Sequence, residues 1–190
     1  MANLRGEVGA SNVKKREIKS KLNFAKYLLN ADNDLVREVF RTMIEDRKYG
    51  KWMKVMTEYK DLLGVTFEQL GRMEDREIKK KVDEYGLREW RRELEEKSTL
   101  GIYRIYKEKI GSEDIYENSY NSVILYRART NTLMLGWRNR FEGGQISCGM
   151  CGAADETLEH FLVECEGLRE VWDRYRDFVG IKEMLGRGIG

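Results

Sequence analysis

Residues 148–165 read CGMCGAADETLEHFLVEC, a stretch that holds every cysteine of the chain and its only histidine. The spacing is C-x2-C-x8-H-x4-C. Zinc prefers four tetrahedral nitrogen and sulfur ligands, and clusters of this kind usually take two ligands from a tight turn and two from a helix. The glycines at 149 and 152 suit the turn, because a knuckle that directs backbone amides at thiolates needs residues that tolerate positive φ. The predicted ligands of one zinc ion are Cys148, Cys151, His160 and Cys165.

The second pair of ligands is predicted on or just after a short helix, DETLEHFLVE, capped by Asp155 or Thr157. His160 and Cys165 are five residues apart. On an ideal α-helix that separation is about 140° of rotation, so the two side chains would not share a face. The helix must therefore loosen or end near Glu164.

All four coordination positions are taken by side chains, so none stays open for a substrate water. The zinc is therefore predicted to be structural. Its binding energy is folding energy, about 10–16 kcal/mol in isolated finger peptides, so the knuckle should unfold without metal. A redox C-x-x-C would need a preceding strand within a βαβ pattern, and none is visible. Clustered, odd-numbered cysteines in an intracellular chain also indicate metal rather than disulfides.

The composition indicates a soluble protein rich in amphipathic helices. Of the 190 residues, 36% are charged and 41% hydrophobic, and proline is absent, so nothing forcibly interrupts helices. No apolar run approaches the roughly 18–20 residues of a membrane-spanning helix, and the start lacks a secretory signal. We expect no membrane association and a nuclear or cytoplasmic location.

Hydrophobic periodicity, helix caps and glycine stops predict an all-α fold, a multi-helix body with a small C-terminal zinc knuckle. Ser11 or Asn12 is expected to cap a first helix that runs to about Leu29 and carries Val13, Ile18, Leu22, Ala25 and Leu29 near one face. Gly64 is expected to end the third helix in the left-handed conformation, and Thr66 and Gln69 are expected to form a capping box. A later helix is predicted from about Ile115 to Arg129. In the second helix, which begins at Asp34, residues Leu35, Val36, Val39, Phe40, Met43 and Ile44 are expected to face inward. Residues 99–110 fit either a helix or a strand, and a helix is favoured. The predicted organisation is a flexible arm at residues 1–10, a helical body at 11–140, a joint at 141–147, the zinc knuckle at 148–167, and a C-terminal helix and tail at 168–190.

Charge is spread unevenly although the net charge is only +2. Residues 1–30 hold seven basic and two acidic side chains, and residues 121–147 hold four basic and one acidic. Residues 148–190 hold five basic and nine acidic side chains. A polyanion would therefore meet the first two regions rather than the knuckle.

Basic residues interleaved with polar and aromatic ones precede the knuckle and begin the first helix. Arginine and lysine contacts to phosphate supply most nonspecific affinity for nucleic acid, and an exposed tryptophan can stack on a base. The alternatives are that Trp137 is core, that the arginines pair with acidic residues, and that the lysine face is merely solvated. The candidate nucleic-acid contacts are Arg127, Arg129, Asn131, Trp137, Arg138 and Arg140, with Lys14, Lys15, Arg16 and Lys19.

Catalysis finds little support in the sequence. The only histidine is committed to zinc, so no histidine base is left, and the cysteine nucleophiles lose their partners. The glycines are dispersed and form no P-loop or dinucleotide fingerprint. We therefore expect no enzymatic activity.

Two stretches, RARTNTLMLGWRNR at 127–140 and the knuckle itself, give the chain a family resemblance. Together with VILYRARTNTL at 123–133, they resemble the C-terminal tail of invertebrate non-LTR retrotransposon reverse transcriptases, in which a Cys-Cys-His-Cys knuckle follows the polymerase domain. The similarity extends over roughly residues 30–175, including WRRELEEKSTL and KEKIG, and is specific at the knuckle and its Arg-Thr-Asn-Thr lead-in. No Asp-Asp polymerase signature is present.

The resemblance implies binding of template RNA or target DNA rather than DNA synthesis. The sequence thus predicts a non-catalytic, zinc-dependent module that binds RNA or single-stranded nucleic acid. The alternative is a structural or protein-interaction zinc module whose acidic finger or helical body binds a partner chain. Salt-dependent binding separates the two, because phosphate contacts weaken steeply as salt rises.

Overall fold

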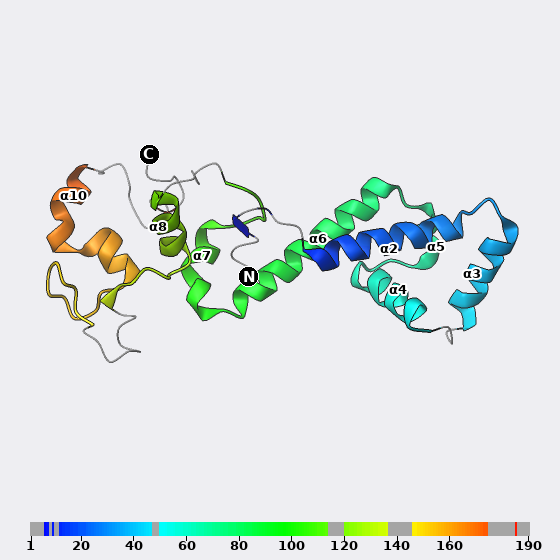
Figure 1. The fold of residues 1–190 in the computed structure, drawn as a ribbon, viewed down its shortest axis with the longest axis horizontal. Coiled ribbons are helices and arrows are strands. Elements are labelled where there is room, and N and C mark those ends of the chain that lie inside the picture. Colours follow the sequence, from blue (N-terminus) through cyan, green and yellow to red (C-terminus); the bar gives the residue numbers. More distant parts are fainter. Residues whose placement is uncertain are drawn as a thin grey trace. The chain divides into compact units, whose positions relative to one another are not determined.

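The computed structural model describes residues 6–7, 9, 12–46, 50–113, 120–136, 146–174 and 185, and these residues are mostly helical (Figure 1). No β-strand occurs among them, so the predicted all-α class is confirmed. The chain divides into two compact units, which we call the helical unit (residues 10–93) and the knuckle unit (residues 1–9 and 94–190). No helix in the described ranges is both long and apolar enough to span a bilayer.

The helical unit begins with α2 (Val13–Leu29), whose start is fixed by Asn12. The Asn12 side chain accepts a hydrogen bond from the backbone N–H of Lys14, which satisfies one of the free donors at the helix start. The buried face of α2 carries Ile18, Leu22 and Ala25. The burial of these three residues confirms the face expected from the sequence, whereas Val13, which was expected on the same face, is 69% exposed.

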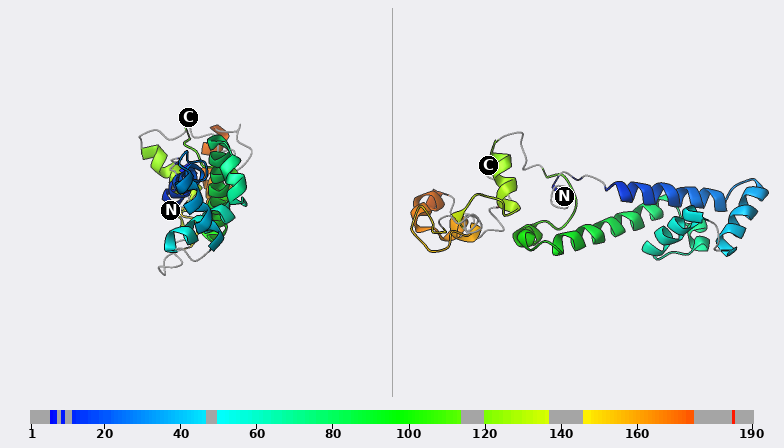
Figure 2. Two further views of the ribbon diagram at one scale, coloured as in Figure 1. Left: turned by 90° about the vertical axis from the view of Figure 1, so that its right-hand side faces the viewer. Right: turned by 60° about the horizontal axis from the view of Figure 1, so that its bottom comes forward.

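Helix α6 (Asp75–Glu95), the longest, lies antiparallel to α2 (Figure 2). Two ion pairs set this direction: Lys15 at the start of α2 pairs with Asp83, and Lys26 near its end pairs with Asp75 at 2.6 Å. Ile78, Val82 and Tyr85 of α6 join the α2 face in one apolar core.

Helices α4 (Gly50–Leu62) and α5 (Phe67–Arg72) complete this core. Gly64 ends α4 with φ of 62°, the left-handed conformation predicted for a glycine stop. Thr66 then opens α5 with the predicted capping box, in which its hydroxyl accepts from Gln69 N while the Gln69 side chain accepts from Thr66 N. Both sequence predictions are confirmed.

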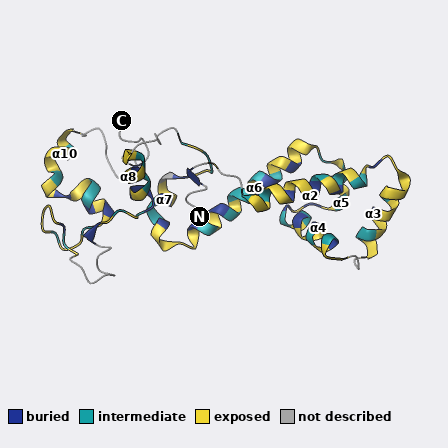
Figure 3. Cartoon of the chain, viewed as in Figure 1, coloured by how far each residue is buried: buried dark blue, intermediate teal, exposed yellow. Residues whose placement is uncertain are grey.

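The prediction for α3 (Asp34–Asp46) is partly wrong, because much of its apolar face is exposed. Leu35 is 72% exposed, Val36 37% and Val39 51%, and Phe40 is the only buried residue of the helix. Figure 3 shows α3 mostly in the colour of exposed residues. The physical reason is that α3 is anchored through a narrow strip, with the Phe40 ring set between Trp52 and Phe67.

The knuckle unit contains the segment that was ambiguous in the sequence. Residues Ser98–Leu100 form a 3-10 turn that leads into α7 (Gly101–Tyr106), so the favoured helix is confirmed as far as Tyr106. Residues 107–110, which were included in that prediction, are not helical. Helix α8 (Tyr120–Arg129) follows, and the residues at 114–119, where its start was predicted, lie outside the described part. After the cysteines come a 3-10 turn (Glu166–Leu168) and α10 (Arg169–Arg174). Of these, α10 lies within the predicted C-terminal helix, and the turn begins inside the predicted knuckle.

Two predicted boundaries differ from the observed division. The body expected over residues 11–140 is shared between the two units, which separate within α6 at Glu93 and Leu94. The described residues of the expected flexible arm include Glu7, which is only 3% exposed and belongs to the knuckle unit. Nothing within residues 1–10 indicates this burial, because Lys107 and Arg129, which pair with Glu7, lie beyond residue 100.

Candidate metal centre

The first two cysteines sit on a tight turn closed by backbone hydrogen bonds. Cys148 N donates to Ala153 O at 2.8 Å, and Gly152 N donates to Cys148 O at 2.8 Å. Gly152 has φ of 77°, as the sequence predicted, whereas Gly149 adopts no positive φ. Most residues with a side chain would be strained at position 152, so glycine is favoured there.

The third ligand, His160, begins a π-helix over His160–Glu164, and the fourth, Cys165, directly follows it. Thr157 caps the preceding turn, since its hydroxyl accepts from His160 N at 3.0 Å. A π-helix has hydrogen bonds from residue i to i+5, so residues five apart lie about one turn apart on the same face. This brings Cys165 back towards His160 and confirms that the helix loosens before Cys165.

The four predicted ligands come together in space. Cys148 Sγ lies 3.7 Å from Cys165 Sγ, and Cys151 Sγ lies 3.3 Å from His160 Nε2. All four ligand atoms are within 4.8 Å of one another. A tetrahedral zinc ion with Zn–S bonds of about 2.3 Å would separate two sulfurs by about 3.8 Å. The four side chains are therefore close enough to hold one metal ion, and their donor set suits zinc.

The two sides of the cluster differ in environment. Cys148 and Cys165 are each 1% exposed, whereas Cys151 lies at the surface. A hydrogen bond from the Ala153 backbone N–H lowers the pKa of Cys151, while burial raises the pKa of Cys165. Because zinc ligation requires deprotonated sulfur, binding of the metal and loss of the Cys165 proton are linked.

Two glycines let backbone segments approach the cluster closely. A Cβ at Gly167 would lie 2.6 Å from Met150 O, and one at Gly136 would lie 2.5 Å from Ile146 O. Gly136 N also donates to Glu156 Oε2 at 2.5 Å, while Glu156 N donates to Ile146 O at 3.2 Å. Glu156 thus links the segment that follows α8 to the knuckle through hydrogen bonds. Its acidic side chain alone did not predict this positioning role.

The knuckle shares its hydrophobic core with α8. Leu158 of the knuckle helix is buried with Leu125 and Ala128 of α8, and Phe161 and Leu162 pack against the same cluster. Folding of the metal site and placement of α8 are therefore coupled through apolar contacts.

Comparisons of the chain with protein-family models, curated proteins and solved structures found no match. The assignment of the metal centre thus rests on ligand chemistry and geometry. Spacing, donor type and the approach of four ligand atoms all indicate the same site.

Arg129 was predicted to contact nucleic acid, and the structure contradicts this. Its side chain is fully buried, with Nη1 at 2.6 Å from Glu113 Oε2 and 3.2 Å from Glu7 Oε2. Its Nε donates to Leu185 O at 2.7 Å. A guanidinium held in this way cannot reach a phosphate, so Arg129 has a structural role and does not contact nucleic acid. For Arg129, the alternative interpretation, in which the arginine pairs with acidic side chains, is correct.

Lys107 completes this buried charge cluster by pairing with Glu113. Burial acts to raise the pKa of Glu113, but hydrogen bonds from Lys107 and Arg129 outweigh it and hold that pKa below its usual value. Buried charges persist in a fold when they are paired and hydrogen-bonded in this way. The cluster joins the described N-terminal residues to α8 within the knuckle unit.

The remaining candidates before the knuckle have different placements. Arg127 is exposed on α8. Asn131 is half-buried with φ of 54° and ends α8, where Thr132 N donates to Arg127 O and Asn131 N to Ala128 O. These two hydrogen bonds form a Schellman motif at the end of the helix, in which one residue adopts a left-handed conformation that asparagine tolerates. The helix ending therefore explains the presence of Asn131 without a contact to nucleic acid. The candidates outside the described residues are Trp137, Arg138 and Arg140.

The basic candidates of α2 also separate into two groups. Lys15 pairs with Asp83, and its aliphatic stem lies against Gly86. Lys14, Arg16 and Lys19 are exposed, and their side chains form no ion pair with the described part of the chain. Three of the four cations predicted on α2 are therefore available to a ligand.

Proposed function

We propose that this chain is a non-catalytic, zinc-dependent module that binds RNA or single-stranded nucleic acid. The main observation behind the proposal is the set of four candidate zinc ligands, which is complete without a substrate. The knuckle that carries these ligands shares a hydrophobic core with α8, and α8 presents the exposed Arg127. A zinc ion with four protein ligands stabilises a fold and leaves no position for substrate. Zinc would accordingly act here by positioning a binding surface.

The distribution of charge supports α8 and the segment after it as the contact surface. Arg127 is exposed on α8, and the segment at 137–140 adds Arg138 and Arg140 in sequence. Asp155, Glu159 and Glu164 of the knuckle are exposed and would repel phosphate. We infer that the knuckle orients this arginine segment. The resemblance to retroelement reverse-transcriptase tails, which implies binding of RNA or DNA, agrees with this proposal.

The absence of catalysis is part of the proposal. The chain has one histidine and three cysteines, and all four belong to the metal cluster. Bound to zinc, they are neither a general base nor a nucleophile. The proposed activity is therefore binding alone, through contacts of arginine and lysine side chains with nucleic acid and without a chemical step.

The test is a binding titration of the zinc-loaded chain with a labelled RNA oligomer, followed by fluorescence anisotropy at increasing salt. Binding at low salt should weaken steeply, and Arg127→Ala should lower the slope of log affinity against log salt by about 0.7 for one lost single-strand phosphate contact. The paired change Arg138→Ala with Arg140→Ala should lower it further. Arg174→Ala, at an exposed arginine of α10, is the matched control.

Zinc content is measured on each variant, so that loss of binding is not confused with loss of the fold. Unchanged affinity in all of the arginine variants would reject the assigned surface. No binding of RNA or DNA at low salt would reject the nucleic-acid function itself.

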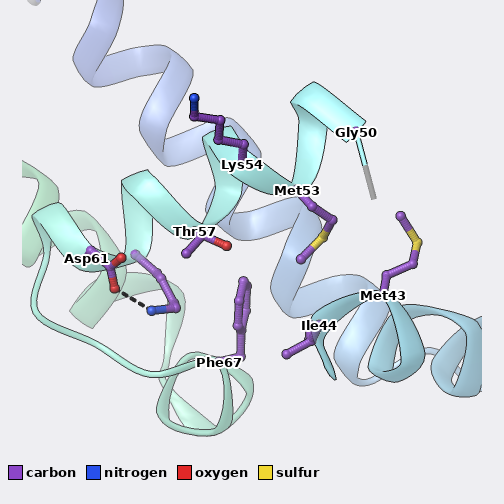
Figure 4. Close-up of a pocket in the computed structure, with 9 residues that line it drawn as sticks. Met43, Ile44, Gly50, Met53, Lys54, Thr57, Asp61 and Phe67 are labelled. Atoms are coloured by element: carbon purple, nitrogen blue, oxygen red, sulfur yellow. Dashed lines mark hydrogen bonds and ion pairs between the residues drawn. The ribbon is translucent and has the colours of Figure 1, made fainter. Parts of the chain in front are cut away.

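The second candidate function is a protein-interaction module, and α3 favours it. The exposed side chains of Leu35 and Val39 lead along the helix to Met43, which lines a pocket with Met53 and Phe67 (Figure 4). Exposed apolar surface that continues into a groove is typical of surfaces that bind another chain. Apolar binding of this kind tolerates salt, whereas phosphate binding does not, so the same salt series separates the two functions.

A further inference from the structure

Two aromatic side chains on α2 are exposed beside each other. Phe24 is 49% exposed and Tyr27 64%, and their rings stack with centroids 6.2 Å apart and 18° between planes. The core face of α2 lies elsewhere, at Ile18, Leu22 and Ala25. The outer face of the helix therefore presents a pair of nearly parallel π-surfaces to solvent.

This pair is anchored to the core of the helical unit. The Phe24 ring meets Trp52 of α4 edge to face at 6.1 Å, and Trp52 meets the buried Phe40 at 5.9 Å. Phe40 in turn meets Phe67 at 6.1 Å. Rings held in place before a ligand arrives lose little conformational entropy on binding, so they form a preorganised stacking surface.

The same helix carries an excess of positive charge. Six of its seventeen residues are lysine or arginine, against the single acidic residue Glu17. Lys21 pairs with Glu17 at 2.5 Å, and Lys15 and Lys26 are held by α6. The cations left exposed are Lys14, Arg16 and Lys19.

Arg16 and Tyr27 lie on the solvent-facing side of α2, opposite its buried residues, with Lys19 about 60° to one flank of Arg16 and Phe24 about 80° to the other. Arg16 and Tyr27 are eleven residues apart, which on an α-helix is close to three full turns, or about 16 Å along the axis. Between them, exposed Ser20 continues the line. A ligand extended along this side would meet positive charge first and aromatic surface next.

We propose that this side of α2, the α2 surface (Arg16, Lys19, Phe24 and Tyr27), binds unpaired nucleotides, with bases stacking on Tyr27 and Phe24 and phosphates contacting Arg16 and Lys19. This inference rests on the proposed function and names a binding site for it. Bases within a duplex are stacked on their neighbours and do not reach an aromatic ring, so the ligand is single-stranded. Single-stranded RNA and DNA share this chemistry.

The experiment uses the zinc-loaded full chain and three labelled probes of one sequence: single-stranded RNA, single-stranded DNA and the corresponding duplex. Tyr27→Leu should weaken single-strand binding at least about fivefold, because one base–aromatic stack is lost. Tyr27→Phe keeps the ring and should restore wild-type affinity. The double change Arg16→Gln with Lys19→Gln should lower the salt slope by about 0.7 for each phosphate contact.

The matched control is Lys54→Gln with Lys80→Gln, which removes the same charge from exposed positions of the helical unit outside the α2 surface. It should leave the affinity within about twofold of wild type if binding depends on position rather than net charge. Circular dichroism verifies the helical content of every variant. Whichever single strand binds more tightly identifies the sugar that the surface accepts.

Three results would overturn the inference, and they differ from failure of the proposed function. The α2 surface is wrong, although the proposed function stands, if the chain binds single strands and Tyr27→Leu binds them as tightly as wild type. The same conclusion follows if the Lys54 and Lys80 control loses as much affinity as the Arg16 and Lys19 variant. Equal binding of the duplex, with equal loss in Tyr27→Leu, would refute stacking on unpaired bases. If no probe binds at low salt, the proposed function fails and this site fails with it.

Discussion

Arg127 and Arg129 stand two residues apart on α8 and have opposite placements. Residues two apart on an α-helix point about 200° from each other, so one can be exposed while the other is buried. Arg127 is exposed, and Arg129 is fully buried against Glu7 and Glu113. A local count of positive charge cannot distinguish them, since the acidic partners come from distant parts of the chain.

Gly136 is a single residue on which the approach of two segments depends. Gly136→Ala places a Cβ 2.5 Å from Ile146 O, a backbone atom that cannot turn aside. We expect the substitution to lower the free energy of unfolding by about 1–3 kcal/mol, as other overpacked sites do. The measurement is chemical denaturation of the zinc-loaded protein.

Gly101→Ala is the control for that substitution, because its Cβ meets only a side-chain nitrogen of Arg104 at 3.8 Å. As a helical glycine, it should give a protein that is unchanged or more stable by up to about 1 kcal/mol. If Gly136→Ala is as stable as Gly101→Ala, the close approach of residues 136 and 146 is wrong.

Tyr59 should titrate late in alkali. Burial, followed by a hydrogen bond to Glu17, raises the pKa of Tyr59 to about 12. Between the unfolded pKa of about 10 and the folded value, the folded state binds more protons. This contribution to stability is complete below about pH 10 and is lost as pH rises towards 12. Tyr59→Phe should remove one tyrosine's step near pH 12 from the absorbance titration, and an identical curve in that variant would contradict the burial.

At the scale of elements, the knuckle depends on a departure from regular helix. The π-helix at His160–Glu164 brings the fourth ligand onto the face of the third, and Gly152 permits the turn that holds the first two. Neither distortion is favoured by a short isolated segment. The core shared with α8 stabilises them, and a metal ion held by the four ligands would stabilise them further.

Removal of the metal should therefore unfold one element while leaving another intact. On treatment with a strong zinc chelator, amide hydrogen exchange should accelerate across residues 148–168, whose geometry depends on ligation. Protection in α2 and α6 should persist, because the core of the helical unit contains no ligand. Zinc release is followed with a coloured chelator. If the knuckle amides stay protected from hydrogen exchange after all zinc is released, the metal has no structural role.

At the scale of the whole molecule, each unit has its own core. Ile18, Leu22, Leu70, Ile78 and Val82 are fully buried within the helical unit, while a separate cluster around Leu125 and Leu158 belongs to the knuckle unit. A core of this kind is the usual requirement for a segment to fold by itself. The four candidate metal ligands all lie in the knuckle unit.

Residues 10–93 expressed alone should fold without zinc. We expect a helical circular dichroism spectrum and a cooperative thermal transition that added chelator leaves unchanged, because the fragment keeps its apolar core. A broad, non-cooperative transition would show instead that this unit depends on residues beyond Glu93. Intact chain under the same conditions is the reference.

Local features were determined by the sequence itself. Asn12, Gly64 and the Thr66–Gln69 capping box act within a few residues, so propensity and hydrogen bonding decide the ends of α2, α4 and α5. The four ligands are likewise confined to eighteen residues, and their order and spacing were enough to predict the cluster and the loosened helix.

Only the tertiary structure decided which faces are covered. The apolar residues Leu35 and Val39 are exposed and Arg129 is buried, and in both cases the cause is the presence or absence of a partner far along the chain. The division at Glu93 has no marker in the sequence, because α6 continues across it. Burial is a property of contacts between distant segments, and periodicity specifies a face without specifying what covers it.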